Sequence, residues 1–202
     1  MSVLPGLFVV LSGPSGVGKT TVAHALFNLL PNLVPSVSCT TRLPRPGEVD
    51  GQDYHFLSNE DFLQKQKEDY FFETVFLHGA WRGTPKEPAL RHRDQGKDTL
   101  FVIDGQGGLA IQTAYPDNTL TIGLVPKNLE VLSMRLKSRD QDSPGEIQRR
   151  LANAQKEISR LEENYEYIVV NDDLPTCVGK VKAIFEQAKE RQASRHATKK
   201  IL

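Results

Sequence analysis

The chain contains apolar runs of strand length that alternate with segments of helical periodicity. The apolar runs are LFVVLS at 7–12, TLFVID at 99–104, TLTIGLV at 119–125 and YEYIVVN at 165–171. Nearly continuous apolar strands are typical of a parallel sheet that is buried on both faces. Stripes of apolar residues between and after the runs predict helices; their members are Val22, Leu26, Leu29 and Leu30, then Leu129, Leu132 and Leu136, then Val178, Val181, Ile184 and Phe185. The pattern predicts an α/β fold with a parallel sheet flanked by helices.

Residues 36–87 break this rhythm. They contain prolines, glycines and most of the aromatic residues, and the short runs YHFL and YFFETVF alternate like β-structure. We expect an antiparallel subdomain with a short helix near 58–67, inserted into a core formed by residues 1–35 and 88–202. The polar segment KSRDQDSPGE and the residues after it predict a lid at about 137–149 between two helices. The basic tail, 189–202, is expected to be solvated or frayed.

Composition restricts the class of protein. Lys and Arg number 25 and Asp and Glu number 25, so the formal charges cancel. This balance gives no support for a nucleic-acid or membrane partner. Two cysteines are too few for a disulfide framework, and the apolar run near the N-terminus is too short for a membrane span. We therefore expect a cytoplasmic protein with reduced thiols, although Cys39 lies near the candidate site and a reactive role is the alternative.

The segment GPSGVGKT matches the phosphate-loop pattern G-x-x-x-x-G-K-[ST] at every fixed position. It follows a predicted strand and opens a predicted helix, so its backbone N–H groups and the helix dipole favour an anion. Lys19 is expected to reach the β- and γ-phosphates of a nucleoside triphosphate, and the Thr20 hydroxyl to hold Mg²⁺. The predicted ATP-binding residues of this segment are Gly13, Pro14, Ser15, Gly16, Val17, Gly18, Lys19, Thr20 and Thr21.

Two arginines follow in the segment TTRLPRPGEVDGQDYHF. Pro44 and Pro46 bias Arg42 and Arg45 toward stiff, extended backbone, which predicts that both arginines face an anion. The planar guanidinium fork matches phosphate oxygens. The alternative for each arginine is a surface ion pair with Glu48 or Asp50.

These segments, together with GAWRGT, VIDGQG and VNDDL in that order, resemble guanylate kinase from about residue 7 to about residue 188. The resemblance implies a P-loop core with an inserted GMP-binding subdomain and a lid. It implies transfer of the γ-phosphoryl of ATP to GMP or dGMP, giving ADP and GDP or dGDP, for purine nucleotide recycling. ATP and GMP are the implied partners and Mg²⁺ the implied cofactor, and the oligomeric state, monomer or dimer, stays open.

The resemblance also assigns site residues. It implies that Arg42, Arg45 and Tyr54 grip the GMP phosphate and that Glu73 accepts hydrogen bonds from N1 and N2 of guanine. The remaining implied GMP contacts are Ser38, Thr84 and Asp104. The alternative for Glu73 is an outward-facing strand residue.

For the donor side, the resemblance implies that Arg135, Arg139 and Arg150 close over the transferring phosphoryl, while Arg149 faces solvent. It places Asn171 beside the adenine of ATP, with turn capping as the alternative. For Arg135 and Arg139 the alternative is a position on a helix surface. The residues expected to carry catalysis are Lys19, Arg42, Arg135 and Arg150.

Two positions depart from the family pattern. Trp81 and Arg82 stand where two tyrosines are usual, and Val102 stands where an acidic residue is usual. We predict that Arg82 replaces the tyrosine hydroxyl as a contact to the GMP phosphate. Two other functions are weighed: a non-catalytic phosphopeptide-binding module, which the intact phosphate loop argues against, and a kinase for another small phosphorylated acceptor, which Arg82 and Val102 motivate.

Overall fold

A five-stranded parallel sheet forms the centre of the computed structural model, which describes residues 4–77, 79–137 and 144–199. The strand order is β2-β7-β1-β8-β9, and every neighbouring pair is parallel. The bounds are β1 Phe8–Ser12, β2 Leu33–Pro35, β7 Asp98–Val102, β8 Thr119–Val125 and β9 Tyr167–Val170. The predicted α/β fold with a parallel sheet is thus confirmed, and β2 is the strand that the apolar runs did not predict.

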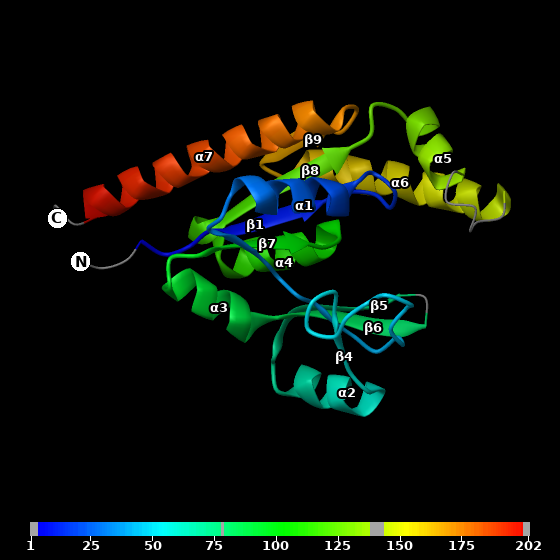
Figure 1. Cartoon of the computed structure of the whole chain (residues 1–202), viewed down its shortest axis with the longest axis horizontal. Coiled ribbons are helices and arrows are strands. Elements are labelled where there is room, and N and C mark those ends of the chain that lie inside the picture. The colour runs from blue at the N-terminus through cyan, green and yellow to red at the C-terminus, as the bar shows by residue number, and fades with distance from the viewer. Residues whose placement is uncertain (1–3, 78, 138–143, 200–202) are drawn as a thin grey trace.

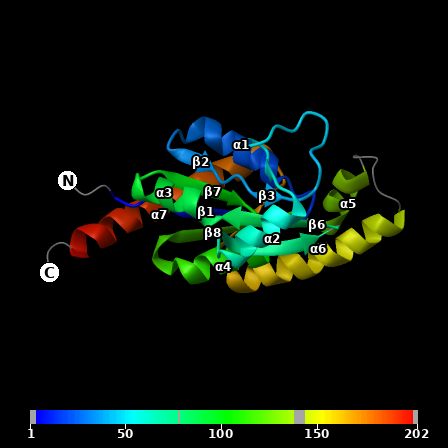
Figure 2. The same ribbon diagram turned by 90° about the horizontal axis from the view of Figure 1, so that it is seen from below.

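Helices cover both faces of this sheet, as Figures 1 and 2 show. Successive residues of a strand point to opposite faces. Val9 and Leu11 pack in one core with residues of α1 and α7, whereas Phe8 and Val10 pack in another with residues of α3, α4 and α6. Burial on both sides explains why the strand sequences are apolar throughout. The bounds are α1 Lys19–Leu29, α3 Lys86–Asp94, α4 Gly105–Ala114, α6 Pro144–Asn164 and α7 Leu174–Lys199.

A second sheet lies below the first in Figure 1, with α2 at its far side. Its strand order is β4-β3-β6-β5; the β3–β6 and β5–β6 pairs are antiparallel, and the β3–β4 pair is parallel. Its elements are β3 Cys39–Thr40, β4 His55–Phe56, α2 Asn59–Lys67, β5 Phe71–Leu77 and β6 Ala80–Pro85. The helix agrees with the one expected near 58–67.

Aromatic rings fill the space between α2 and this second sheet. Phe62 stacks against Phe71 with ring centroids 4.6 Å apart and against Trp81 at 5.8 Å. Cys39 is buried in the same cluster, and burial raises the pKa of its thiol to about 11. A thiol that stays protonated at neutral pH is a poor nucleophile, which argues against the reactive role weighed for Cys39.

The segment predicted as a lid falls between α5 (Leu129–Lys137) and α6. Residues 138–143 lie outside the described residues, and so does Arg139. On α5 the predicted apolar stripe is confirmed by Leu132 and Leu136, which are buried. On α1 the stripe is shorter than predicted: Leu29 is 51% exposed, because the helix ends there and only its preceding turns face the sheet.

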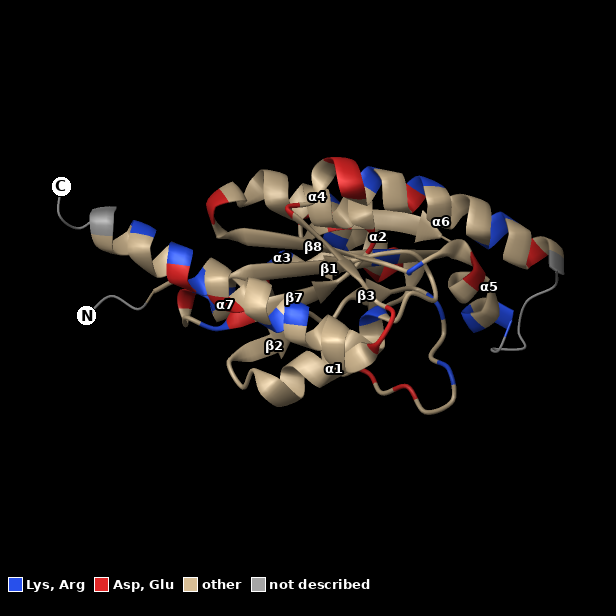
Figure 3. Cartoon of the chain, turned by 90° about the horizontal axis from the view of Figure 1, so that it is seen from above, with Lys and Arg blue, Asp and Glu red and all other residues tan. Residues whose placement is uncertain are grey.

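The described part of the C-terminal tail is mostly exposed, as a solvated end would be, but it is helical and not frayed. Helix α7 continues to Lys199, and Lys189 donates a hydrogen bond of 2.8 Å to the buried carboxylate of Asp98. The backbone N–H of Leu7 donates to the same Oδ1 at 2.7 Å. A carboxylate that is buried has to be paired, so Asp98 fixes this part of α7 to the sheet. Charged residues of both signs lie along the outer faces of α6 and α7 (Figure 3), and no described helix is long and apolar enough to cross a membrane.

We expect two glycine substitutions to have opposite effects on stability. In Gly108→Ala on α4, a Cβ would stand 1.9 Å from Oη of Tyr165 and 2.6 Å from Cγ1 of Val10. Overpacking of this kind costs about 1–3 kcal/mol of unfolding free energy. In Gly179→Ala on α7 the Cβ meets nothing within 4 Å, so better helix propensity should add about 0.5–1 kcal/mol. Urea unfolding measures both; equal effects would contradict the close packing of α4 on β1.

Candidate active site

The phosphate loop connects β1 to α1 through backbone that favours glycine. Gly16 and Gly18 have φ angles of 86° and 103°, and Gly18 caps α1. A Cβ at Gly18 would stand 2.6 Å from Nδ2 of Asn171. The loop therefore turns with its backbone close to a neighbouring side chain, which a larger residue would not allow.

Two side chains hold this loop from behind. The Nδ2 group of Asn171 donates to the carbonyl of Val17 at 2.7 Å, and Nη1 of Arg135 donates to the same oxygen at 3.1 Å. Nη2 of Arg135 also donates to the carbonyl of Asn171 at 3.1 Å. The structure thus brings two of the predicted donor-side residues, Arg135 and Asn171, to the loop. Asn171 is buried against the loop instead of capping its own turn.

Lys19 lies across the loop in this structure. Its Nζ donates to the carbonyl oxygens of Gly13 and of Pro14, the latter at 3.3 Å. Thr20 and Thr21 follow in the first turn of α1 and are exposed. The ammonium group therefore lies against backbone carbonyl oxygens of the loop. An anion bound by the loop would compete with these oxygens for the ammonium group.

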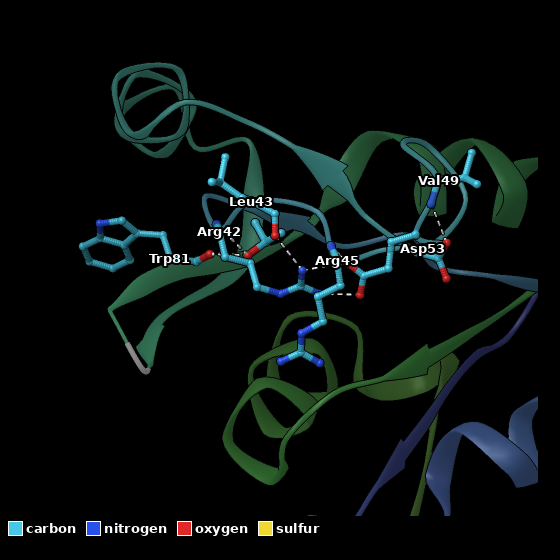
Figure 4. Close-up of polar contacts among 8 residues, drawn as sticks. Arg42, Leu43, Arg45, Val49, Asp53 and Trp81 are labelled. Carbon is cyan, nitrogen blue, oxygen red and sulfur yellow. Dashed lines mark hydrogen bonds and ion pairs between the residues drawn. The ribbon is translucent and has the colours of Figure 1, made fainter. Parts of the chain in front are cut away.

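Arg42 forms the centre of the acceptor side (Figure 4). Its Nη1 and Nη2 atoms donate to Oε2 and Oε1 of Glu48, each at 2.6 Å. Its Cζ lies 5.0 Å from the ring centroid of Tyr54. The ion pair weighed as the alternative for this arginine is thus present. Bonds from Arg42 and from the backbone N–H of Arg45 lower the pKa of Glu48 to about 2, so its carboxylate stays charged.

The other predicted phosphate contacts surround the same ring. Cζ of Arg82 lies 5.9 Å from the Tyr54 centroid, and Arg82 forms no ion pair within the described part of the chain. The Arg45 side chain is exposed, and only its backbone N–H is bonded to Glu48. Trp81, by contrast, packs into the aromatic cluster of the subdomain. Arg42 and Arg82 therefore both lie within 6 Å of the Tyr54 ring, and Arg45 follows on the same loop as Arg42. The role of these residues at a phosphate stays a prediction.

Glu73 is half-buried between the two sheets. Its Oε1 accepts a hydrogen bond of 2.7 Å from the hydroxyl of Thr84 on β6. Asp104 caps α4 by accepting from the backbone N–H of Gly107 at 2.9 Å, and a Cβ on Gly107 would lie 3.0 Å from Cγ of Glu73. Burial raises the pKa of Glu73, Thr84 opposes this shift, and the charge of Asp104 adds to it. The alternative of an outward-facing Glu73 is therefore wrong: β5, β6 and α4 bring these carboxylates together.

Two more predicted residues are placed less closely. The carbonyl of Ser38 accepts from the backbone N–H of His55 at 2.9 Å, which places Ser38 at the start of the second sheet. Arg150 lies on α6, one position after Arg149, which pairs with Glu146 and is exposed, as expected. The roles of Ser38 and Arg150 stay predictions.

Sequence reasoning missed a buried polar link beneath the site. The hydroxyls of Ser12 and Tyr165 are 2.8 Å apart, and the Ser12 hydroxyl also lies 3.2 Å from the carbonyl oxygen of Asp104, so it donates to one of these two acceptors at a time. The Tyr165 hydroxyl donates to the carbonyl of Gly105 at 3.2 Å. The link joins the root of the phosphate loop to the start of α4. The only signal in the sequence is a serine in an otherwise apolar run.

The parallel sheet, the glycine loop at the carboxyl end of β1 and the lysine inside it define a P-loop phosphate-binding protein. The family model for guanylate kinase matches residues 6–188. Guanylate kinase of Maricaulis maris is 45% identical over 179 residues, 89% of this chain and 82% of that protein. Guanylate kinase of Anaeromyxobacter dehalogenans is 42% identical over 192 residues, 95% of this chain and 85% of that protein.

Among solved structures, guanylate kinase from Anaplasma phagocytophilum superposes with a TM-score of 0.73 at 32% sequence identity, covering 91% of this chain and 86% of that one. The chain belongs to the guanylate kinase family and is a kinase. This family assignment confirms the resemblance seen in the sequence and argues against a non-catalytic binding module.

The raised pKa of Glu73 predicts how its replacement changes stability. In the folded state this carboxyl binds its proton more tightly than in the unfolded state. The free energy of unfolding therefore falls as the pH rises from the unfolded-state pKa to the folded-state pKa. The destabilisation from burying the charged carboxylate is complete above the folded-state pKa and absent below the unfolded-state pKa of about 4.3. Glu73→Gln should therefore unfold at higher urea concentration than the wild type at neutral pH, and the difference should close near pH ~4. A difference that is independent of pH would contradict burial of the charge.

Proposed function

We propose that this enzyme transfers the γ-phosphoryl group of ATP to GMP or dGMP, giving ADP and GDP or dGDP. The observation that carries the proposal is the placement of Glu73 and Thr84 beside the start of α4, next to an arginine cluster on the same sheet. The Glu73 carboxylate and the Thr84 hydroxyl suit the polar edge of a purine base, and the arginines suit the phosphate of the same nucleotide. The buried, reduced cysteines fit the cytoplasm, where such a reaction would use the purine nucleotide pool.

Glu73 is the proposed reader of the base. Guanine offers N–H donors at N1 and N2, whereas adenine has an acceptor at N1 and lacks the N2 amine. AMP would leave the carboxylate unpaired, at a cost of about 1–3 kcal/mol or more. Glu73→Gln should accordingly lower kcat/KM for GMP by roughly 30-fold and leave ATP affinity unchanged.

On the donor side, we assign the triphosphate to the loop from Gly13 to Thr21, with Lys19 at the β- and γ-phosphates. Arg135, Arg139 and Arg150 are proposed to stabilise the charge that develops on the transferred group, because phosphoryl transfer depends on positioned cations. Asn171 is proposed to lie near the adenine of ATP. The subdomain of residues 36–87 and the lid of about 137–149 are proposed to close over the two nucleotides and exclude water.

Mg²⁺ is the proposed cofactor. In the described residues no group of three or more His, Cys, Asp or Glu side chains could hold a metal ion, and Thr20 is exposed at the start of α1. This fits Mg²⁺, which is commonly bound by substrate phosphates, water and one or two protein oxygens. Bound in this way, it would neutralise charge on the phosphates, with the Thr20 hydroxyl as its protein ligand.

A coupled assay of ADP release with Mg²⁺ and ATP tests the proposed function against GMP, dGMP, AMP, UMP and CMP. We expect turnover with GMP and dGMP only. Lys19→Ala serves as the control and should lose at least ~10²-fold in kcat, since it removes a cation that stabilises developing charge. Circular dichroism verifies folding. Preference for another monophosphate would overturn the acceptor assignment, and full turnover by the folded variant would overturn the role of the loop.

Arg82→Ala should raise KM for GMP by roughly tenfold, the size of one charge-assisted hydrogen bond. Its place near the Tyr54 ring motivates this expectation. Since the contact is ionic, added salt should weaken GMP binding more in the wild type than in the variant. An unchanged KM with unchanged salt dependence would mean that Arg82 faces solvent in the loaded enzyme.

A further inference from the structure

The guanidinium of Arg42 has five N–H donors in a fixed plane, and their partners can be accounted for. Nη1 donates to the carbonyl of Leu43 at 2.9 Å and to Oε2 of Glu48 at 2.6 Å. Nη2 donates to Oε1 of Glu48 at 2.6 Å. The edge formed by Nη1 and Nη2 is therefore occupied by the Glu48 carboxylate.

The other edge of the same group lacks a partner. Nε of Arg42 is buried, and its N–H donates to no acceptor among the described residues. The second hydrogen of Nη2 lies on the same side as this N–H, so the two donors form a second fork. A buried donor without a partner is costly and rare in folded proteins. Within the guanidinium, the Nε–Nη2 edge is therefore the edge that can still serve a further hydrogen-bond acceptor.

The plane of the guanidinium is also fixed. Its Cζ lies 5.0 Å from the Tyr54 centroid and 5.7 Å from that of Phe56. The aromatic rings restrict its tilt, and the two bonds to Glu48 restrict its rotation within the plane. Glu48 is itself held, because its Oε2 accepts from the backbone N–H of Arg45 at 2.8 Å.

We infer that Glu48 is a positioning residue, which holds the Nη1–Nη2 edge of Arg42 so that the Nε–Nη2 edge receives the acceptor phosphate. The inference rests on the proposed function. It adds that Glu48 stays bound to Arg42 when the nucleotide is present and does not compete with the substrate for this arginine. Two planar forks of one guanidinium can serve a carboxylate and a phosphate at once.

The charges agree with this arrangement. Arg42 and Glu48 cancel as a pair, which leaves Arg45 and Arg82 as the remaining formal positive charges among the proposed phosphate contacts. A nucleoside monophosphate carries close to two negative charges at neutral pH. The site would then balance its ligand, and an arginine fixed in advance loses little freedom on binding.

The test compares two ligands that differ only in the phosphate. Calorimetry without ATP measures Kd for GMP and for guanosine in the wild type and in Glu48→Gln. The glutamine keeps one oxygen acceptor but turns an amide donor toward a guanidinium donor. We expect Kd for GMP to rise about tenfold and Kd for guanosine to stay the same.

Asp53→Asn is the matched control. Asp53 lies on the same loop and accepts from the backbone N–H of Val49 at 2.8 Å, and within the described residues it forms no hydrogen bond with Arg42 (Figure 4). This variant should leave Kd for GMP within about twofold of the wild type, because no phosphate ligand is displaced. Equal losses in both variants would mean that Glu48 only supports the fold of the loop.

A double-mutant cycle tests whether Glu48 acts through Arg42. In an Arg42→Lys background, which has no fork, Glu48→Gln should change Kd for GMP by less than about twofold. A second readout is the ¹⁵N-detected NMR signal of the Arg42 Nε–H group, which should shift with GMP and not with guanosine.

Tighter GMP binding by Glu48→Gln would overturn the inference, because Glu48 would then compete with the phosphate. Unchanged GMP binding by this variant, or full additivity in the double-mutant cycle, would also overturn it. So would an Arg42 Nε–H signal that does not shift when GMP is added. Failure of the proposed function looks different, because the wild type itself would then bind GMP no better than AMP.

Discussion

The carbonyl oxygen of Val17 accepts hydrogen bonds from Asn171 and from Arg135, and this shared acceptor fixes the phosphate loop. Asn171 follows β9 and Arg135 lies on α5, so segments far apart in the chain meet at one backbone atom. A loop rich in glycine would otherwise have many conformations to lose on binding an anion. Because both donors bind a carbonyl oxygen, they occupy none of the loop's backbone N–H groups. The catalytic geometry therefore depends on the C-terminal half of the sheet being in place.

The second sheet is joined to the core by an equally specific contact. Helix α4 begins beside β5, and Gly107 leaves room for the side chain of Glu73. One carboxylate oxygen of Asp104 caps this helix, and this bond fixes the position of the Asp104 side chain relative to Glu73. Beneath α4, the hydroxyls of Ser12 and Tyr165 connect the same helix to the root of the phosphate loop. The proposed donor and acceptor sites are thus attached to one helix, and movement of α4 would disturb both.

The arginine loop shows how a cationic site can be built before its ligand arrives. Repulsion between neighbouring cations is reduced by Glu48, whose low pKa keeps it charged over the whole physiological range. The aromatic faces of Tyr54 and Phe56 limit the orientation of Arg42. This organisation explains why the loop contains an acid and aromatic residues in addition to its arginines. A site made of arginines alone would have to order them at the moment of binding.

Local patterns in the sequence were sufficient for the main elements and for the phosphate loop. The four apolar runs became β1, β7, β8 and β9, because burial on both faces leaves a signal in consecutive residues. The loop motif was equally local, since its glycines, lysine and threonine lie within eight positions. The proposed acceptor residues, however, came from resemblance to a family, because nothing in FFETVF by itself distinguishes Glu73 from an exposed strand residue.

Tertiary structure decided the features that depend on contacts between distant segments. Strand β2 is too short for a pattern, and its place at the sheet edge follows from pairing with β7. The partner of Lys189, the orientation of Glu73 toward Thr84 and the shared acceptor at Val17 each join residues that the sequence separates. Sequence periodicity reports which face of an element is buried, whereas a hydrogen bond also requires the position and direction of its partner. The sequence by itself therefore determined the fold class and the phosphate loop. The local conformation of the loop from Arg42 to Glu48 decided which edge of Arg42 is occupied, and packing of β5, β6 and α4 decided which carboxylates meet.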